Sequence, residues 1–191
     1  MRINTNWVAG VAVSMGVAMA AWPATAAASC APETTSQPFA ALGDKNRYFL
    51  APGGDFEDGL SWAAMGSTAI ADGVSNGIDS GTRAARLSQN AYITSPAVCF
   101  DVDRPHIRLM ARSLGGSGTL RVDAIDAAGD KNQLAKLDAG AHQTWAASRF
   151  VALDPRLDLA GSPSQYAKLR ITALTGQWLV DAVYVDPYSR G

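Results

Sequence analysis

Residues 52–59 read Pro-Gly-Gly-Asp-Phe-Glu-Asp-Gly, and Trp62 follows them closely. A second motif lies almost at the C-terminus, where residues 178–186 read Trp-Leu-Val-Asp-Ala-Val-Tyr-Val-Asp. Between these motifs, short alternating apolar segments are separated by Gly, Pro, Asn and Asp, the residues that end strands and form turns. The pattern predicts a chain of β-strands that is framed by the two motifs.

Two segments show the period of a strand most clearly. In residues 106–114 and 166–174, small or aliphatic side chains at odd positions alternate with longer or more polar ones at even positions. Successive side chains of a strand point to opposite faces, so each segment should have one buried and one wetter face. Gly115–Gly118 is interpreted as a hairpin that joins 106–114 to the next strand. We expect about eight to ten antiparallel strands, the others lying within residues 47–50, 67–74, 84–87, 92–94, 96–102, 119–125, 132–137 and 178–186.

The N-terminal residues 1–28 are predicted to be a signal peptide. Arg2 supplies a positive charge, residues 7–20 are apolar and uncharged, and small residues follow at 24–28. This is the pattern that signal peptidase recognises, and the apolar run is too short for a membrane span. We therefore expect a secreted or periplasmic protein cleaved before Ser29, with no transmembrane segment in the mature chain.

The charge balance excludes a nucleic-acid-binding class. The whole chain has 16 basic and 17 acidic side chains and a net charge of −1. No block of Lys or Arg is present, and such a block is what would release counterions from a nucleic acid. We predict no nucleic-acid partner.

The two cysteines, Cys30 and Cys99, are predicted to form a disulfide. In an oxidising compartment, two thiols in one small domain are usually paired. The alternative makes Cys30 the lipidated first residue of a lipoprotein. The large aliphatic residue that normally opens a lipobox is missing, so the disulfide is the preferred interpretation.

The two framing motifs also carry a family resemblance. Residues 55–59 with Trp62 resemble the Gly-Phe-Glu-x-Gly…Trp opening of carbohydrate-binding modules of the galactose-binding-like type, and residues 180–183 resemble their Ile-Asp-Asp-Val last strand. The order of Cys, Pro-Gly-Gly-x-Phe-Glu, Ser-Pro-x-x-Cys and Val-Tyr-Val-Asp-Pro-Tyr is similar to that of a group of secreted bacterial proteins. The resemblance spans Cys30–Tyr188 and implies an all-β fold, an antiparallel jelly-roll β-sandwich over residues 46–191, after an irregular leader at 29–45.

The resemblance further implies a structural calcium ion. In calcium-bearing relatives of this type, an acidic residue near the opening motif and another on the last strand help to bind the cation. Here those positions are Glu57 and Asp181, with Asp55 as a possible extra ligand. Calcium takes six to eight oxygens, and the second Asp of the Asp-Asp pair is Ala182 here, which removes one ligand. The alternative is that Glu57 and Asp181 cap turns or pair with Arg.

The resemblance implies a non-catalytic module that binds a glycan or another extracellular polymer. Sugar binding uses aromatic rings beside hydrogen-bonding groups, and the candidates are Trp145, Tyr92 and Tyr166. Trp62 and Trp178 are interpreted as core residues, because both belong to the framing motifs.

Two other functions remain as alternatives. One is a structural or adhesion module of the cell envelope with a protein partner, and the more distant one is a glycan-active hydrolase. The sequence offers no Gly-x-Ser-x-Gly nucleophile motif, and its only histidines, His106 and His142, are interpreted as surface residues. We therefore predict that the chain is not an enzyme.

Overall fold

The structure, a computed structural model, describes residues 30–101, 104–153 and 165–186. The predicted signal peptide and the last residues of the family pattern lie outside this range. The described part holds thirteen strands and two short 3₁₀ turns, η1 (Ala40–Leu42) and η2 (Ala139–Ala141). Within it, no helix has the length and apolar character that a bilayer crossing requires.

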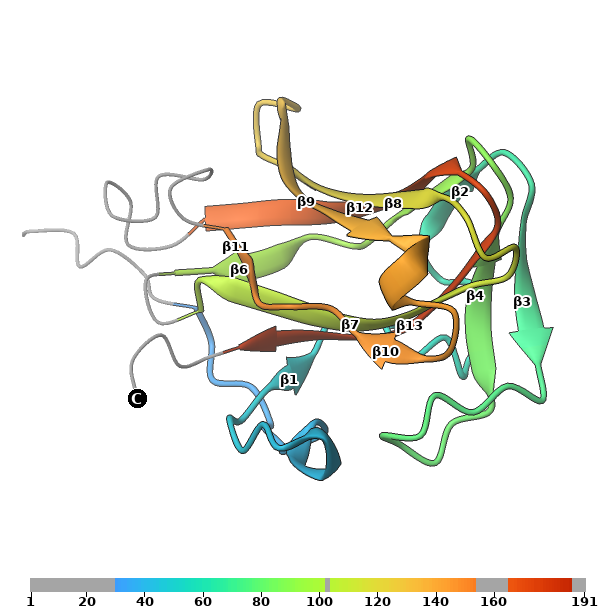
Figure 1. Ribbon diagram of the computed structural model, residues 1–191. Helices are drawn as coiled ribbons and strands as arrows, with labels where there is room; N and C mark the ends of the chain where they lie inside the picture. The colour runs from blue at the N-terminus through green and yellow to red at the C-terminus, as the bar shows by residue number, and fades with distance from the viewer. Residues whose placement is uncertain (1–29, 102–103, 154–164, 187–191) are drawn as a thin grey trace, which may run out of the picture.

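The strands form two antiparallel sheets that face each other, shown in Figure 1 as an upper layer with β8, β9 and β12 and a lower layer with β7 and β13. The seven-stranded sheet has the order β10-β7-β13-β4-β3, with β1 paired to β13 and β11 paired to β7. Its strands are β1 (Phe49–Leu50), β3 (Thr68–Asp72), β4 (Arg83–Leu87), β7 (His106–Ser113), β10 (Ala146–Ala147), β11 (Val151–Ala152) and β13 (Trp178–Asp186).

The six-stranded sheet has the order β2-β5-β12-β8-β9, with β6 paired to β12. The antiparallel β-sandwich that the sequence predicts is thus confirmed. The strands of this sheet are β2 (Ala63–Met65), β5 (Tyr92–Thr94), β6 (Val98–Phe100), β8 (Thr119–Ile125), β9 (Lys131–Asp138) and β12 (Gln165–Thr175).

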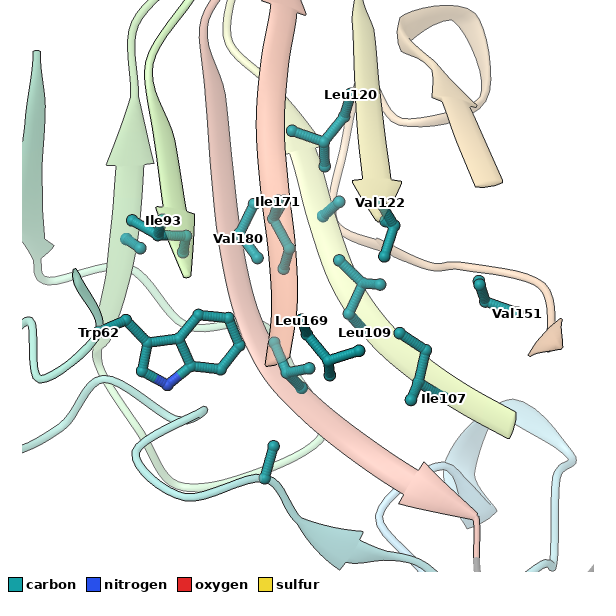
Figure 2. Close-up of a cluster of buried hydrophobic side chains, with 14 of the residues drawn as sticks. Trp62, Ile93, Ile107, Leu109, Leu120, Val122, Val151, Leu169, Ile171 and Val180 are labelled. Atoms are coloured by element: carbon teal, nitrogen blue, oxygen red, sulfur yellow. The ribbon is translucent and has the colours of Figure 1, made fainter. Parts of the chain in front are cut away.

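The core lies between the two sheets and is built by the alternation seen in the sequence. In β7 the odd-numbered residues from Ile107 to Ser113 are buried, and in β12 those from Ala167 to Ala173 are buried. Figure 2 shows Ile107 and Leu109 on one strand and Leu169 and Ile171 on another as members of one apolar cluster. Burying an aliphatic side chain of this kind contributes about 1.5–3 kcal/mol, so this interdigitated layer holds the sheets together.

The two framing motifs meet in space. The amide of Ala51 donates to the carbonyl of Val183 at 2.9 Å, and the amide of Val183 donates to the carbonyl of Gly54 at 3.0 Å. Phe56 is fully buried and packs edge-on against Trp62, with 5.4 Å between the ring centroids. The opening motif therefore behaves as an extension of the last strand, although the two segments are far apart in sequence.

The last strand makes room for this contact with a bulge. The register between β13 and β7 shifts between Asp181 and Tyr184, and Ala182 has a φ of 50° in the left-handed region. The Asp181 carboxylate accepts a hydrogen bond from the amide of Ala182 at 2.7 Å. Because the bulge turns Val183 away from β7, its backbone is free to bond the opening motif.

The predicted disulfide is confirmed. Cys30 is bonded to Cys99 on β6, with 5.7 Å between the Cα atoms and a sequence separation of 69. In the chain-entropy model, closing a loop of this length lowers the entropy of the unfolded chain by an amount worth about 4 kcal/mol. The bridge ties the leader to the six-stranded sheet and fits an oxidising compartment.

The predicted leader covers the other sheet. Ser36 forms an isolated antiparallel bridge with Tyr48, and Phe39 is fully buried. We call the group in which Phe39 packs the leader cluster; it consists of Phe39, Tyr48, Met110, Ala182 and Tyr184, with Leu50, Ile78, Trp145 and Ala147 partly buried against it.

Two expectations about the strands were wrong. The described strands exceed the expected eight to ten because β2, β10 and β11 are edge pieces of two or three residues, too short to show a period. Gly115–Gly118 does not close a hairpin, because β7 and β8 belong to different sheets and the segment crosses between them. A Gly-rich connection fits either geometry, so the sequence could not distinguish them.

Replacing Gly54 by Ala should destabilise the fold strongly. A Cβ atom at this position would lie 2.9 Å from the carbonyl oxygen of Val183 and 3.0 Å from that of Ala51. Backbone atoms cannot move aside cheaply, so we expect a loss of about 1–3 kcal/mol in the free energy of unfolding, measured by urea titration.

Gly115→Ala is the matched control, because a Cβ there meets no atom within 4 Å. Its effect should stay within about 0.5 kcal/mol. Equal stability of Gly54→Ala and the wild type would contradict the packing of the opening motif on β13.

Candidate functional site

The two outer faces of the sandwich differ in how much of them is covered. On the seven-stranded sheet, Met110 and Tyr184 face outward but are buried under the leader cluster. Trp145, one of the predicted ligand-binding residues, packs half-buried against the same cluster. Its ring is therefore used at least partly for packing.

The outer face of the six-stranded sheet carries polar and aromatic side chains instead. Strand alternation places there the residues that lie between the buried core positions of each strand. We call this surface the polar face; it consists of Tyr92 and Thr94 on β5, Tyr166, Lys168, Arg170 and Thr172 on β12, Arg121 and Asp123 on β8, and Lys136 on β9.

Arg170 is the centre of the polar face. Its guanidinium lies over the ring of Tyr92, 4.2 Å from the centroid, and its Nε donates to the hydroxyl of Thr94 at 3.0 Å. On the neighbouring strand, the Nε of Arg121 donates to the carboxylate of Asp123 at 2.8 Å. Stacking and hydrogen bonding hold both arginines in place, so the donors they present to the surface are preorganised.

Thr172 lies between these two groups. In the register of the sheet it is opposite Tyr92 on one side and Arg121 on the other. Its residue is 7% exposed, and its hydroxyl is buried without a hydrogen-bond partner. A buried hydroxyl without a partner costs free energy, so this position holds an unsatisfied polar atom beneath the surface of the face.

The predicted residues Tyr92 and Tyr166 lie on the same face of the same sheet. Tyr166 is 62% exposed and is paired with the disulfide residue Cys99. Because Thr172, six residues along β12 from Tyr166, is the partner of Tyr92, the two tyrosines are separated by about 20 Å along the strand. They mark the two ends of an extended surface.

The structure does not bring all predicted ligand-binding residues together. Trp145 precedes β10 in the seven-stranded sheet, whereas Tyr92 and Tyr166 belong to the six-stranded sheet. The sequence reasoning missed Arg170, Thr172 and Arg121. The alternation in 166–174 was the available signal, since it placed the Lys, Arg and Thr side chains on the face that carries Tyr166.

The predicted metal residues lie at the bulge of β13, where acidic side chains form a hydrogen-bonded network. One Asp181 oxygen accepts from the Asn76 side-chain amide at 2.8 Å, and the same amide group donates to Asp79 at 3.1 Å. The Glu57 carboxylate accepts from the amides of Thr82 and Arg83 at 2.9 and 2.7 Å. Glu57 therefore caps the start of β4, as the alternative interpretation of the sequence proposed.

Burial controls the charge of Asp181, which is 1% exposed. Burial raises the pKa of Asp181 to about 8, and the negative charges of Asp79 and Glu57 add to this increase. Hydrogen bonds from the Ala182 amide and from Asn76 act in the opposite direction. The side chain is thus mostly protonated at neutral pH.

The pKa of Tyr184 is raised by burial and by the same group of acidic side chains. Burial raises the pKa of its phenol to about 12, and Asp79, Asp55 and Asp181 contribute to the rise. Asp55, the third predicted metal residue, therefore lies near the acidic group.

These residues do not fit a calcium site as they stand. The side-chain oxygen of Asn76 accepts from the amide of Ile78 at 2.9 Å and from that of Asp79 at 3.3 Å. This fixes the orientation of its amide, so that an N–H donor lies between the two carboxylates where a cation would need an oxygen. Among the described residues, no group of three or more His, Cys, Asp or Glu is arranged to hold a metal ion. Calcium binding stays a prediction.

A groove at the edge of the sandwich contains the second histidine. Its volume is about 510 Å³, and it lies between β9 and the β10–β11 segment, with Lys136, His142 and Phe150 among its lining residues. The expectation that His142 is a surface residue was wrong: it is buried, its Nδ1 lies 2.9 Å from the carbonyl of Asp138, and its ring packs beside Trp178. His106 is half-buried, and its ring packs against Phe150.

Asp181→Asn should flatten the pH dependence of stability. An unfolded Asp has a pKa near 3.9, so between about pH 4 and pH 8 the folded chain keeps a proton that the unfolded chain has lost. Stability therefore falls as pH rises through this window, by up to about 1.4 kcal/mol per pH unit for one proton. Urea titrations at several pH values should show a steeper fall for the wild type than for the Asn variant. Parallel profiles of stability against pH for the two proteins would contradict the raised pKa of Asp181.

Calcium should leave the melting temperature unchanged. The carboxylates of Asp79 and Asp181 are already bonded to Asn76, and a cation would have to displace these hydrogen bonds. Thermal melts with millimolar calcium and with a chelator should coincide. A higher melting temperature in calcium would show that the network opens to bind the ion, as the sequence resemblance implies.

No protein-family model matches the chain, and no curated protein matches its sequence. Solved structures with some similarity to this one include several carbohydrate-binding modules. A family 22 xylan-binding domain from Paenibacillus barcinonensis has 14% identity and a TM-score of 0.49, and the match covers 69% of this chain and 90% of that one.

Two other similar structures are a second carbohydrate-binding module and an adhesin domain. The family 6 module of a laminarinase from Zobellia galactanivorans has 14% identity and a TM-score of 0.46, covering 66% of this chain and 93% of that one. The K1 cleaved adhesin domain of Lys-gingipain from Porphyromonas gingivalis has 14% identity and a TM-score of 0.47, covering 72% and 96%. At these identities the similarity concerns the fold.

Proposed function

We propose that this chain is an exported, non-catalytic module that binds a glycan on the polar face. The observation that carries the proposal is the row formed by Tyr92, Arg170 and Thr94, in which a guanidinium lies over an aromatic ring and is fixed by a hydrogen bond to the threonine hydroxyl. A sugar ring offers a C–H face for aromatic contact and several hydroxyls for hydrogen bonding. The row supplies both kinds of group.

The shape of the face supports a polymeric ligand. The strand β12 contributes four residues in succession to the polar face, from Tyr166 to Thr172, and every one of these positions is on the same side of the sheet. A surface that extends for about 20 Å along one strand suits a chain of sugars better than a single monosaccharide. Tyr166 at one end and Tyr92 at the other provide the aromatic contacts.

A binding role is supported more directly than a hydrolytic one. Glycosidases need two carboxyl groups on either side of an accessible bond. The carboxyl with the clearest pKa change, Asp181, is 1% exposed and hydrogen-bonded to Asn76 and to its own neighbour's amide. On the polar face, the Asp123 carboxylate is engaged by Arg121. Export is supported by the disulfide between Cys30 and Cys99.

Tyr92→Ala and Arg170→Ala should weaken binding to an immobilised polysaccharide, measured by retardation in affinity gels against a panel of soluble polysaccharides. Removing the ring also removes the platform for Arg170, so each variant should lose about 1–2 kcal/mol of binding free energy, about a fivefold to thirtyfold weakening. Urea titration of the same variants checks that they fold.

Trp145→Ala serves as the comparison, because its ring packs on the opposite sheet. It should retain wild-type retardation. Loss of binding in Trp145→Ala alone would move the site to the seven-stranded sheet. Absence of retardation on every polysaccharide, together with intact folding, would refute the glycan-binding proposal and favour the adhesion alternative. Release of reducing ends from a bound polysaccharide would refute the non-catalytic part.

A further inference from the structure

The proposed glycan-binding function leaves the chemical class of the glycan open, and the charge on the polar face addresses it. Strand pairing places Arg121 beside Lys136, and β12 adds Lys168 and Arg170. Lys131, at the start of β9, is paired with Ile125 and is also exposed. Five cationic side chains thus belong to one sheet of a protein whose overall net charge is −1.

The acidic side chains of the same sheet do not cancel this charge. Asp123 is paired with Arg121 at 2.8 Å, and its side chain is 4% exposed. One oxygen of Asp138 accepts from the amide of Gly140, at the end of β9. Among the described residues, Lys131, Lys136 and Lys168 have no carboxylate within ion-pair distance. On the polar face, Lys136, Lys168 and Arg170 therefore have no carboxylate partner in the part of the chain that the structure describes, and Lys131 lies just beyond the face at the start of β9.

Other acidic residues lie away from the middle of the polar face. Glu57, Asp79 and Asp181 lie together at the bulge of β13, and Asp72 pairs with Arg83 at the edge of the seven-stranded sheet. Asp126 and Asp130 lie in the turn between β8 and β9, next to Lys131. The cations without a nearby acid are thus Lys136, Lys168 and Arg170, and such a cluster attracts a ligand of opposite sign.

We propose, on the basis of the glycan-binding function above, that the ligand is an acidic polysaccharide whose sugar units carry carboxylates. Arg170 offers free N–H groups beside an aromatic ring, which suits a carboxylate attached to a sugar. The lysines attract further carboxylates along the polymer.

The test compares polygalacturonate with the same polymer after methyl esterification, which removes the negative charges and keeps the sugar backbone. Binding of the mature chain is measured by isothermal titration calorimetry at low and high salt, with a neutral xylan and a single-stranded oligonucleotide as further probes. We expect binding of the free acid, and weaker binding by about fivefold or more to the ester. Affinity for the acid should fall as NaCl is raised from about 50 mM to about 300 mM, because the cations involved are exposed.

The matched variants remove two charges each. Lys136→Gln with Lys168→Gln takes two unpaired cations from the polar face, and should weaken binding to polygalacturonate by about fivefold. Lys45→Gln with Arg86→Gln takes two exposed cations from outside that sheet, one from the leader and one from β4, and should leave it unchanged. Because none of the four side chains forms a salt bridge among the described residues, both variants should fold.

The outcomes separate this inference from the function on which it rests. Equal binding of the acid and the ester, or binding of xylan alone, overturns the acidic class and leaves glycan binding intact. Failure to bind any polysaccharide overturns both. Binding of the oligonucleotide as tightly as polygalacturonate, with equal loss in the two double variants, overturns the inference by showing a general attraction to polyanions.

Discussion

The whole sandwich depends on one interaction, the pairing of the opening motif with the bulge in the last strand. The backbone of Val183 both accepts from Ala51 and donates to Gly54. It can do so because Ala182 adopts a positive φ and takes Val183 out of register with β7. A regular strand would have bonded Val183 to its neighbour in the sheet, and the segment with Phe56 and Trp62 would then have had no backbone partner at this end of the core.

The same bulge explains why a carboxyl group is buried. A non-glycine residue in the left-handed region is strained, and the hydrogen bond from the Ala182 amide to Asp181 stabilises the turn locally. The carboxyl that provides this bond is then held among Asp79 and Glu57, which raises its pKa. Asn76 satisfies both carboxyls with one amide group, so the network needs no bound ion to fill the space between them. Asp181 and Glu57, which the family resemblance assigns to a cation, thus also accept hydrogen bonds from backbone amides.

Local pattern was sufficient to predict β8 and β13, whose bounds agree with the predicted residues 119–125 and 178–186. Both have long apolar alternation or a motif of their own. The local pattern was insufficient to predict the Gly115–Gly118 crossing and β10, because the sheet that a strand joins is decided by contacts remote in sequence. The same limit applies to the site. Each of Tyr92 and Tyr166 could be selected as an aromatic beside polar residues, but their common face follows only from the pairing of β5 and β6 with β12.

The leader decides which outer face is left for a ligand. Phe39 and Tyr48 cover Met110 and Tyr184, and Arg108 lies over the Phe39 ring at 4.7 Å while pairing with Asp44. These contacts use the aromatic and cationic groups of the seven-stranded sheet for packing. On the six-stranded sheet, Tyr166 and Lys168 of β12 are exposed and Arg170 is half-buried. The disulfide anchors the leader at β6, at one end of that sheet. The seven-stranded sheet thus packs its outer face against the leader. On the six-stranded sheet, the arginines are held by Tyr92, Thr94 and Asp123, and the lysines have no carboxylate partner among the described residues.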